Sequence, residues 1–304
     1  MLLSLLLALQ AVDEPVIVVS GQQKTDAEIR QEAQSFVRAV AATPGSSDQL
    51  GRWNQPICPK VIGATAVEEP LVLTRIREVA VEAGIRLAKR KDCAPNILVA
   101  FTADPSAVTR EVLRQRQHAA RTVPVAMRDD LIQGAYPVRW WYDLKVEGRY
   151  GEAPMGDNPA LLGALRTGNT GPGVGAGGQL AQSENQSGNV TDYSSSLIGT
   201  KSRQSIGAAT IIVDIDRVRG RSKDALASFV AMVALAPLKL PPRAVSTPTI
   251  TNLFYAAENA RADDLSDWDR AYIAALYKTA SNRTAKIQGA SMTARIARTL
   301  RGEE

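Results

Sequence analysis

Histidine is nearly absent from this chain, and cysteine is rare. Among 304 residues there is one histidine, His118, in the polar run RQRQHAAR, and there are two cysteines. A hydrolytic triad needs a histidine or an equivalent base beside its nucleophile, and no G-x-S-x-G turn is present. Zinc sites are built from several cysteine and histidine ligands. We therefore predict no catalytic residue, no metal ligand and no cofactor site of these kinds.

Aromatic residues make up only 5% of the chain, and its positive charge is not concentrated. Lysine and arginine number 36 against 31 aspartates and glutamates, which gives a formal charge of +5. The basic residues between 75 and 121 are interspersed with acids, whereas a nucleic-acid surface groups its cations and interleaves them with stacking aromatics. We therefore predict that no nucleic acid is a partner.

Long apolar runs are also lacking, apart from one at the N-terminus. The run from Leu2 to Leu9 is too short to span a bilayer and soon turns polar, as the core of a signal peptide does. We predict a signal peptide at 1–11, a periplasmic or secreted location, and no transmembrane segment once the signal is removed. No basic residue precedes the run and Leu9-Gln10-Ala11 only half fits a cleavage site, so a buried N-terminal helix or strand is the alternative.

The predicted export also suggests a role for the two cysteines. Cys58 lies in NQPICPK and Cys93 in KDCAPNILV, each beside a proline and outside any apolar element. In an exported protein such a pair forms a disulfide, which for a loop of this size stabilises the fold by about 3–4 kcal/mol. We predict a Cys58–Cys93 disulfide.

The chain does contain enough apolar residues, 45%, to bury a large core. Their spacing predicts helix, buried strand and helix in turn, and therefore an α+β (mixed α/β) fold with a small central sheet covered by helices and a helical C-terminal third. The predicted helices are 25–43, 68–83, 106–121, 222–236, 247–257, 266–279 and 283–300, and the predicted strands 96–102, 136–148 and 204–218, after a short β-branched run at 15–21. The predicted domain parts are 12–150, an insertion at 151–203, and 204–304.

Within the insertion, residues 168–196 are rich in glycine, serine, asparagine and glutamine. Such a composition buries too little apolar surface to order itself. Gly173, Gly175 and Gly178 match G-x-G-x-x-G, but a loop precedes them where a dinucleotide site has a buried strand. We predict a flexible excursion here.

Two carboxylates and a group of serines are the remaining candidates for chemistry. Asp214 and Asp216 are two apart near a strand end and share a face there, so they could hold a divalent cation or act as an acid/base pair. The alternative is a solvated strand end neutralised by Arg217 and Arg219. Lys201 could also serve as the base for one of four nearby serines, against the simpler interpretation of a loop. These serines are Ser194, Ser195, Ser196 and Ser202.

Three aromatic residues are the best candidates for a binding surface. Alternation on a strand puts Trp140 and Tyr142 on one face and Trp141 on the other, so at least one of them could be exposed. Packing in the core is the alternative.

Several strings resemble a group of exported proteins of sphingomonad-type alphaproteobacteria. They are EPVIVVSGQ, RWNQPICP, CAPNILVAFT, AATIIVD, FVAMVALA, PTITNLF and LSDWDRAYIAALY. This resemblance covers nearly the whole chain outside 151–190, and it implies export and overall shape but no reaction.

The last third is also distantly similar to zincin-like secreted proteins. That resemblance places Phe229 and Val233 where the two zinc-binding histidines belong, and Val230 in place of the glutamate. These side chains bind no zinc and activate no water. The resemblance therefore implies a degenerate peptidase-like scaffold.

From these observations we expect a non-catalytic binding or scaffolding role, with an envelope protein or polymer as the partner. The alternative is a hydrolase that uses the carboxylates or serines named above.

Overall fold

The computed structural model describes most of the chain between residues 24 and 303. The described ranges are 24–43, 48–90, 92–115, 123, 125–151, 199–255 and 262–303. Several predicted features lie outside the described residues: the signal peptide at 1–11, the run at 15–21, His118, the glycines and serines of 168–196, and the bulk of the 151–203 insertion.

A four-stranded sheet forms the centre of the fold. Its strands are β1 (Pro59–Ile62), β2 (Ile97–Thr102), β3 (Val138–Gly148) and β4 (Ser202–Asp214). Their order is β1-β2-β4-β3; β1, β2 and β4 are parallel, and β3 pairs with β4 in the antiparallel sense. The three predicted strands are confirmed. β1 was not predicted, because its proline and the preceding Cys-Pro step are typical of a loop; Pro59 is tolerated as the first residue of an edge strand.

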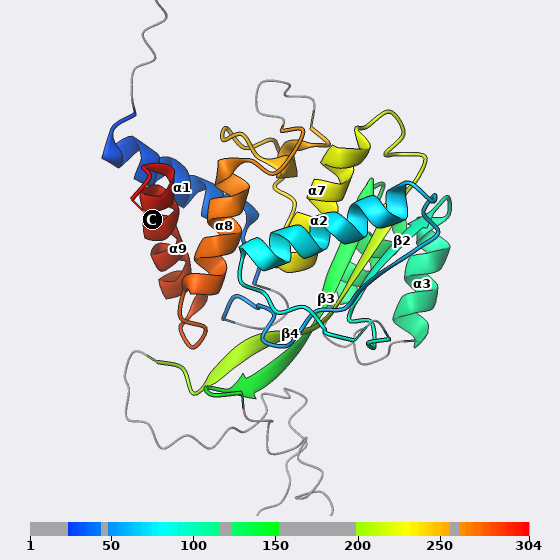
Figure 1. Ribbon diagram of the computed structural model, residues 1–304, viewed down its shortest axis with the longest axis horizontal. Helices are drawn as coiled ribbons and strands as arrows, with labels where there is room; N and C mark the ends of the chain where they lie inside the picture. The colour runs from blue at the N-terminus through cyan, green and yellow to red at the C-terminus, as the bar shows by residue number, and fades with distance from the viewer. Residues whose placement is uncertain are drawn as a thin grey trace, which may run out of the picture.

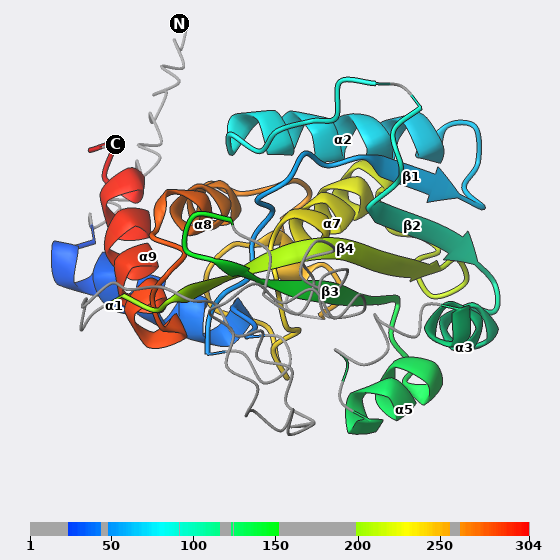
Figure 2. The ribbon, with the colours of Figure 1, turned by 90° about the horizontal axis from the view of Figure 1, so that it is seen from below.

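Seven α-helices lie in the described part of the chain and cover both faces of the sheet. They are α1 (Asp26–Val40), α2 (Glu68–Glu82), α3 (Pro105–Gln115), α5 (Val125–Gln133), α7 (Lys223–Leu235), α8 (Asp267–Lys278) and α9 (Ala285–Leu300). Figures 1 and 2 show α2 and α7 side by side on one face, α3 and α5 on the other, and α1, α8 and α9 packed together at one end. The α+β class and the helical C-terminal third are confirmed.

Alternation along the strands divides the apolar residues between two cores. Val99 of β2 and Ile211 and Val213 of β4 face α2 and α7 and belong to the large core. Ala100 and Ile212, one residue out of phase, join Trp141 in a small core beneath α3 and α5. Because both faces are covered, the strands read as continuous apolar runs, as expected for parallel strands.

Side-chain caps set the starts of two predicted helices. Thr25 accepts a hydrogen bond from the Glu28 N–H while the Glu28 carboxylate accepts one from the Thr25 N–H, which is a capping box for α1. Ser266 and Asp269 make the same reciprocal pair at α8. Gly84 follows the last turn of α2 with a φ of +73°, a backbone conformation that favours glycine.

The prediction of a helix at 247–257 is wrong. The structure has one 3₁₀ turn there, η2 (Ile250–Asn252). The Thr249 hydroxyl accepts from the Thr251 N–H, and the Asn252 side chain bonds the backbone of Val245 and Thr247. Threonine and asparagine thereby offer the backbone local bonds that replace those of a helix. Conversely, the structure contains a helix that was not predicted, α5, because its apolar residues have no clear helical spacing.

Among the described residues, no helix is both long and apolar enough to cross a membrane.

Candidate functional site

The predicted disulfide is present. Cys58 and Cys93 are bonded, with their Cα atoms 6.2 Å apart, and join the residue before β1 to the loop before β2. Asn96 strengthens the same junction: its Oδ1 accepts from the Cys58 N–H at 2.7 Å, and its Nδ2 donates to the Pro56 carbonyl at 3.0 Å. The bond therefore ties together the starts of two neighbouring parallel strands.

The aromatic residues do not form a binding surface, because Trp140, Trp141 and Tyr142 are all buried, at 8%, 3% and 6% exposure, and the alternative of packing in the core is confirmed. The alternation itself is confirmed. Trp140 and Tyr142 face the large core and Trp141 faces the small one. Sequence alternation specifies which faces the side chains occupy, but both faces of this sheet are covered by helices.

Two of these aromatics anchor the end of α7. The Tyr142 hydroxyl lies 2.6 Å from the Val233 carbonyl oxygen and 2.8 Å from that of Ala236, and the Trp140 Nε1–H donates to the Leu238 carbonyl at 2.9 Å. Burial raises the pKa of the Tyr142 phenol well above its ordinary value. The hydroxyl therefore stays protonated, and its role is structural.

Asp214 and Asp216 lie at the carboxyl edge of the parallel strands, but they do not share a strand face. β4 ends at Asp214, and Asp216 belongs to the turn that follows. Asp214 Oδ1 accepts from the N–H groups of Asp216 and Arg217, both at 3.1 Å. The prediction of a shared face is thus wrong, because the Asp214 side chain itself bends the chain into a turn.

The negative charges of Asp214 and Asp216 are neutralised by Arg217 and Arg219, which was the alternative to a cation or acid/base site. Arg217 Nε lies 3.3 Å from Asp214 Oδ2, and Arg219 Nη2 lies 2.7 Å from Asp216 Oδ1. No group of three or more potential metal ligands of the histidine, cysteine, aspartate or glutamate type occurs in the described ranges. The two carboxylates close a turn at the strand end.

The helix that resembles a zinc-binding helix is packed with apolar side chains. Phe229, Val230 and Val233 of α7 are at most 1% exposed, and every residue from Ala225 to Leu235 is buried. Phe229 makes edge-to-face contacts with Trp140 and Phe254, with ring centroids 5.9 and 5.0 Å apart. α7 is the central core helix of the fold.

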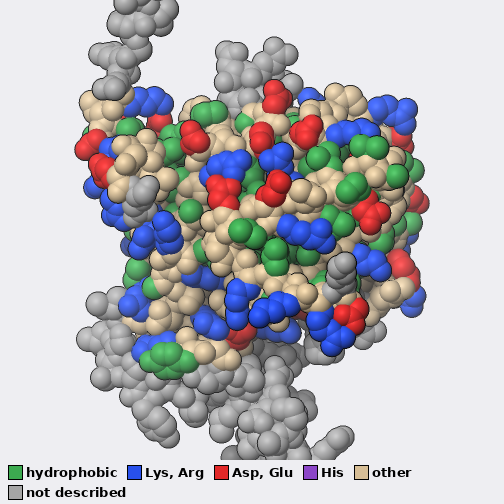
Figure 3. Space-filling model, in the orientation of Figure 1, with side chains coloured by type: hydrophobic (Ala, Val, Ile, Leu, Met, Phe, Trp, Pro, Cys, Tyr) green, Lys and Arg blue, Asp and Glu red, His purple; other side chains and the backbone are tan. Residues whose placement is uncertain are grey.

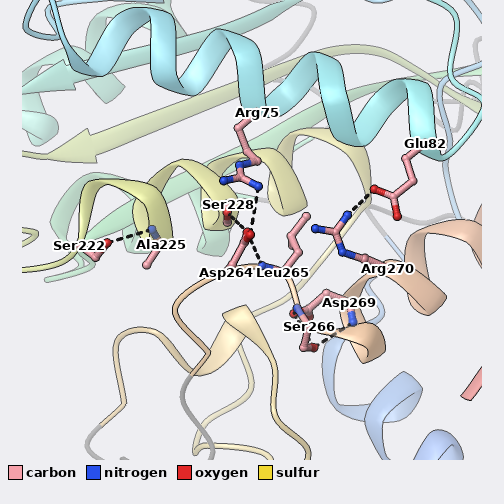
Figure 4. A network of polar contacts seen from close by, with 10 residues as sticks. All are labelled: Arg75, Glu82, Ser222, Ala225, Ser228, Asp264, Leu265, Ser266, Asp269 and Arg270. Carbon is pink, nitrogen blue, oxygen red and sulfur yellow. Dashed lines mark hydrogen bonds and ion pairs between the residues drawn. The ribbon is translucent and has the colours of Figure 1, made fainter.

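A polar network that the sequence did not reveal joins α2, α7 and the start of α8 (Figure 4). The buried Ser228 of α7 donates to Asp264 Oδ1 at 2.5 Å, the Leu265 N–H donates to the same oxygen at 2.6 Å, and Arg75 of α2 lies 3.1 Å from Asp264 Oδ2. A further ion pair joins Arg270 and Glu82. In the sequence, only Ser228, a polar residue inside an apolar helix, indicated that a polar partner would be needed.

Burial acts to raise the pKa of Asp264, but the donors Ser228 and Leu265 and the nearby cations Arg75 and Arg270 outweigh it. The pKa of this carboxyl is therefore held below its ordinary value. Asp264 is ionised at neutral pH and fixes the loop before α8 onto α7.

Asp269 is a second carboxylate with a structural task. It is fully buried, and it accepts from Thr249 Oγ1 at 2.5 Å, from the Ile250 N–H at 2.8 Å and from the Ser266 N–H at 3.0 Å. Burial raises the pKa of Asp269, against the opposing effect of these donors. The residue was predicted as part of a helix start, and this is confirmed; its bonds to η2 were not predicted.

Fold and candidate residues together define an α+β protein with one disulfide, in which the carboxylates of Asp214, Asp216, Asp264 and Asp269 take part in ion pairs, caps and turns. In comparisons with known proteins, no family model, no curated protein and no solved structure matches this chain. The resemblances to an exported alphaproteobacterial group and to zincins stay predictions.

Proposed function

We propose that this chain is an exported envelope protein with a non-catalytic binding or scaffolding role. The observation that carries the proposal is the Cys58–Cys93 disulfide. Disulfides persist in the periplasm and outside the cell, and they are rare in reducing cytosol. The short apolar run at Leu2–Leu9 supports the same location.

The carboxylates that a hydrolase could use have other tasks in the structure, whereas the candidate serines Ser194, Ser195 and Ser196 lie outside the described residues. Asp214 accepts two backbone N–H groups and pairs with Arg217, and Asp216 pairs with Arg219. Asp264 and Asp269 hold loops onto α7 and α8. This supports the binding role over the hydrolase alternative.

The surface we favour for binding is the carboxyl edge of the sheet, where α/β proteins commonly place ligands. Ile62 ends β1 and Ile215 follows β4, and they are 43% and 40% exposed. They flank the end of β2, because Ile62 pairs in register with Ala100 and the Ile215 N–H donates to the Thr102 carbonyl. The neighbouring ion pairs Asp214–Arg217 and Asp216–Arg219 give this apolar centre a charged rim, as in protein interfaces.

A protein partner fits this surface better than a polysaccharide. Sugar rings are held by exposed aromatic faces, and the three neighbouring aromatics of β3 considered for such a platform, Trp140, Trp141 and Tyr142, are buried. Branched aliphatic side chains at the edge suit a protein contact.

The test is mass spectrometry of the protein recovered from its native cells, cross-linked and under non-reducing conditions. We expect a processed N-terminus, the Cys58–Cys93 bond and a cross-linked protein partner. The double variant Ile62→Glu/Ile215→Glu should lose that partner, whereas Ile287→Glu, at an α9 residue of similar exposure (41%), should keep it. An intact N-terminus with free thiols would contradict export, and equal capture by both variants would contradict the surface.

A further inference from the structure

One buried arginine, Arg52, has no carboxylate partner among the residues that the structure describes. Arg52 is 7% exposed and lies in the segment before β1 that runs beside the start of β4, where it forms a bridge with Ser205. Its Nη1 donates to the Tyr277 carbonyl in the last turn of α8 at 3.2 Å. Its Nε and Nη2 are buried, and neither has a hydrogen-bond partner in the described part of the chain.

Such an arrangement is costly for a protein. A guanidinium carries five N–H donors, and an unpaired buried charge costs several kcal/mol. Burial lowers the pKa of Arg52 to about 10, which still leaves the side chain protonated at neutral pH. The nearby Arg203 adds a second positive charge and is itself paired with Glu147 at 2.9 Å. The local charge around Arg52 is therefore not neutralised.

The two free nitrogens are the ones that bind an anion best. Nε–H and Nη2–H lie on the same edge of the guanidinium plane and point in parallel, which matches two oxygens of a carboxylate or a phosphate. We propose that Arg52 anchors a site for an oxyanion group, a carboxylate or a phosphate, which binds through the Nε/Nη2 edge. This site is separate from the carboxyl edge of the sheet and does not depend on the proposed function.

The surroundings of Arg52 are suited to local opening. Segments 48–52 and 199–203 meet there through side-chain hydrogen bonds, such as those from Gln49 Nε2 to Thr200 Oγ1 at 2.5 Å and to the Ser202 carbonyl at 2.9 Å. Breaking a few side-chain contacts of this kind at the start of β4 costs less than global unfolding, so a small anion can enter. Figure 3 shows several Lys and Arg side chains, with a few acidic ones among them, on the lower part of the face drawn there, below α2 and α8, and this favours the approach of anions to the molecule.

A second buried arginine provides the matched control. Arg139 is 4% exposed, and its Nη2 donates to the Gly134 carbonyl at 2.5 Å, while Nε and Nη1 have no hydrogen-bond partner in the described residues. The carboxylates of Asp214 and Asp104 lie close enough to act on its charge. Its free nitrogens are also not the parallel pair. The charge of Arg139 is therefore offset by nearby carboxylates, and its Nε/Nη2 edge is not free to bind an anion.

The test measures thermal unfolding of the purified protein with increasing sodium phosphate or sodium acetate, with sodium chloride holding ionic strength constant. We expect at least one of the two anions to raise the melting temperature of the wild type in a saturable way, and the comparison between them distinguishes phosphate from carboxylate. Arg52→Gln should abolish the effect, and Arg52→Lys should weaken binding by about tenfold or more, because lysine keeps the charge without the fork. Arg139→Gln should keep the effect.

If the Arg52 variants do not fold, the wild type alone decides. In a ¹⁵N-resolved NMR titration, the Arg52 Nε–H resonance should shift with the same anion, and that of Arg139 should not. Stabilisation by neither anion, an equal response in wild type and Arg52→Gln, or an Nε–H resonance of Arg52 that does not respond would each overturn the proposal.

Discussion

At the scale of single residues, polar side chains inside this protein hold loops onto helices. Ser228 is fully buried in α7, and Asp264 reaches it from a half-exposed position in the loop before α8. A buried hydroxyl without a partner would destabilise the fold, so the pair has to form together. The sequence shows the serine as an exception in an apolar helix, but its partner is 36 residues away and could not be identified from spacing.

The replacement Asp264→Asn tests this pair. The pKa of Asp264 is below its ordinary value, so its stabilising effect is fully present above the unfolded pKa near 4 and is lost as the pH falls through the lowered folded pKa. We expect the variant to lose about 1 kcal/mol at pH 7, a modest amount because the carboxyl is half exposed. The difference from wild type should shrink as the pH falls below about 4. Urea unfolding across this pH range measures it, with Asp263→Asn, an exposed neighbour, as the control; a pH-independent difference would contradict the assignment.

At the scale of elements, α7 organises the fold. It is covered by the sheet, α2, η2 and α8, so its residues are buried on all sides. Its sequence is apolar from Ala225 to Leu235 apart from Ser228, which is typical of a core helix, and all of these residues are buried. Ser222 caps its start by accepting from the Ala225 N–H at 3.4 Å, and the aromatics of β3 hold the chain that follows its end.

Truncation of Phe229 tests the role of α7. The ring is fully buried between Trp140 and Phe254, so Phe229→Ala should lower the free energy of unfolding by about 3–5 kcal/mol. Val81→Ala, at a 63% exposed position of α2, should change it by less than about 0.5 kcal/mol. Chemical denaturation followed by tryptophan fluorescence gives both values. Similar losses in the two variants would show that α7 is not the packing centre.

The helices and strands that were predicted correctly are those specified by residues close to one another in the sequence. Capping residues and apolar spacing specify α1, α7, α8 and α9 within a few residues. β1 is different, because four residues gain strand geometry only by pairing with β2. The 247–257 region is different too, because its backbone bonds go to side chains and to Asp269 of α8. The conformation of β1 depends on a distant strand, and that of the 247–257 region depends on local side-chain bonds together with the more distant Asp269.

At the scale of the whole molecule, the disulfide joins two elements that are already neighbours in the sheet. Cys58 and Cys93 are 35 residues apart in sequence and enclose β1 and α2. A crosslink over such a loop stabilises mainly by restricting the unfolded chain. Its removal should therefore lower stability without changing the fold.

The double variant Cys58→Ser/Cys93→Ser should lose about 3–4 kcal/mol of unfolding free energy. Wild type in reducing buffer should behave like the variant, and the variant itself should be insensitive to the reductant. Urea unfolding in both buffers, with circular dichroism of the native state, makes the comparison. A wild type that is indifferent to the reductant would show that the bond adds no stability.

The sequence by itself determined the α+β class, the strands β2, β3 and β4, most helix starts, and the pairing of the two cysteines, because these depend on local spacing, caps and the lack of any other thiol. Only the tertiary structure decided what the candidate side chains do. Trp140, Trp141 and Tyr142 are buried because helices cover both faces of the sheet, and Asp216 leaves the face of Asp214 because β4 ends there. The burial of Arg52, with no anionic partner in the described ranges, also required the fold, since its environment is assembled from β4 and α8, more than 140 residues further along the chain.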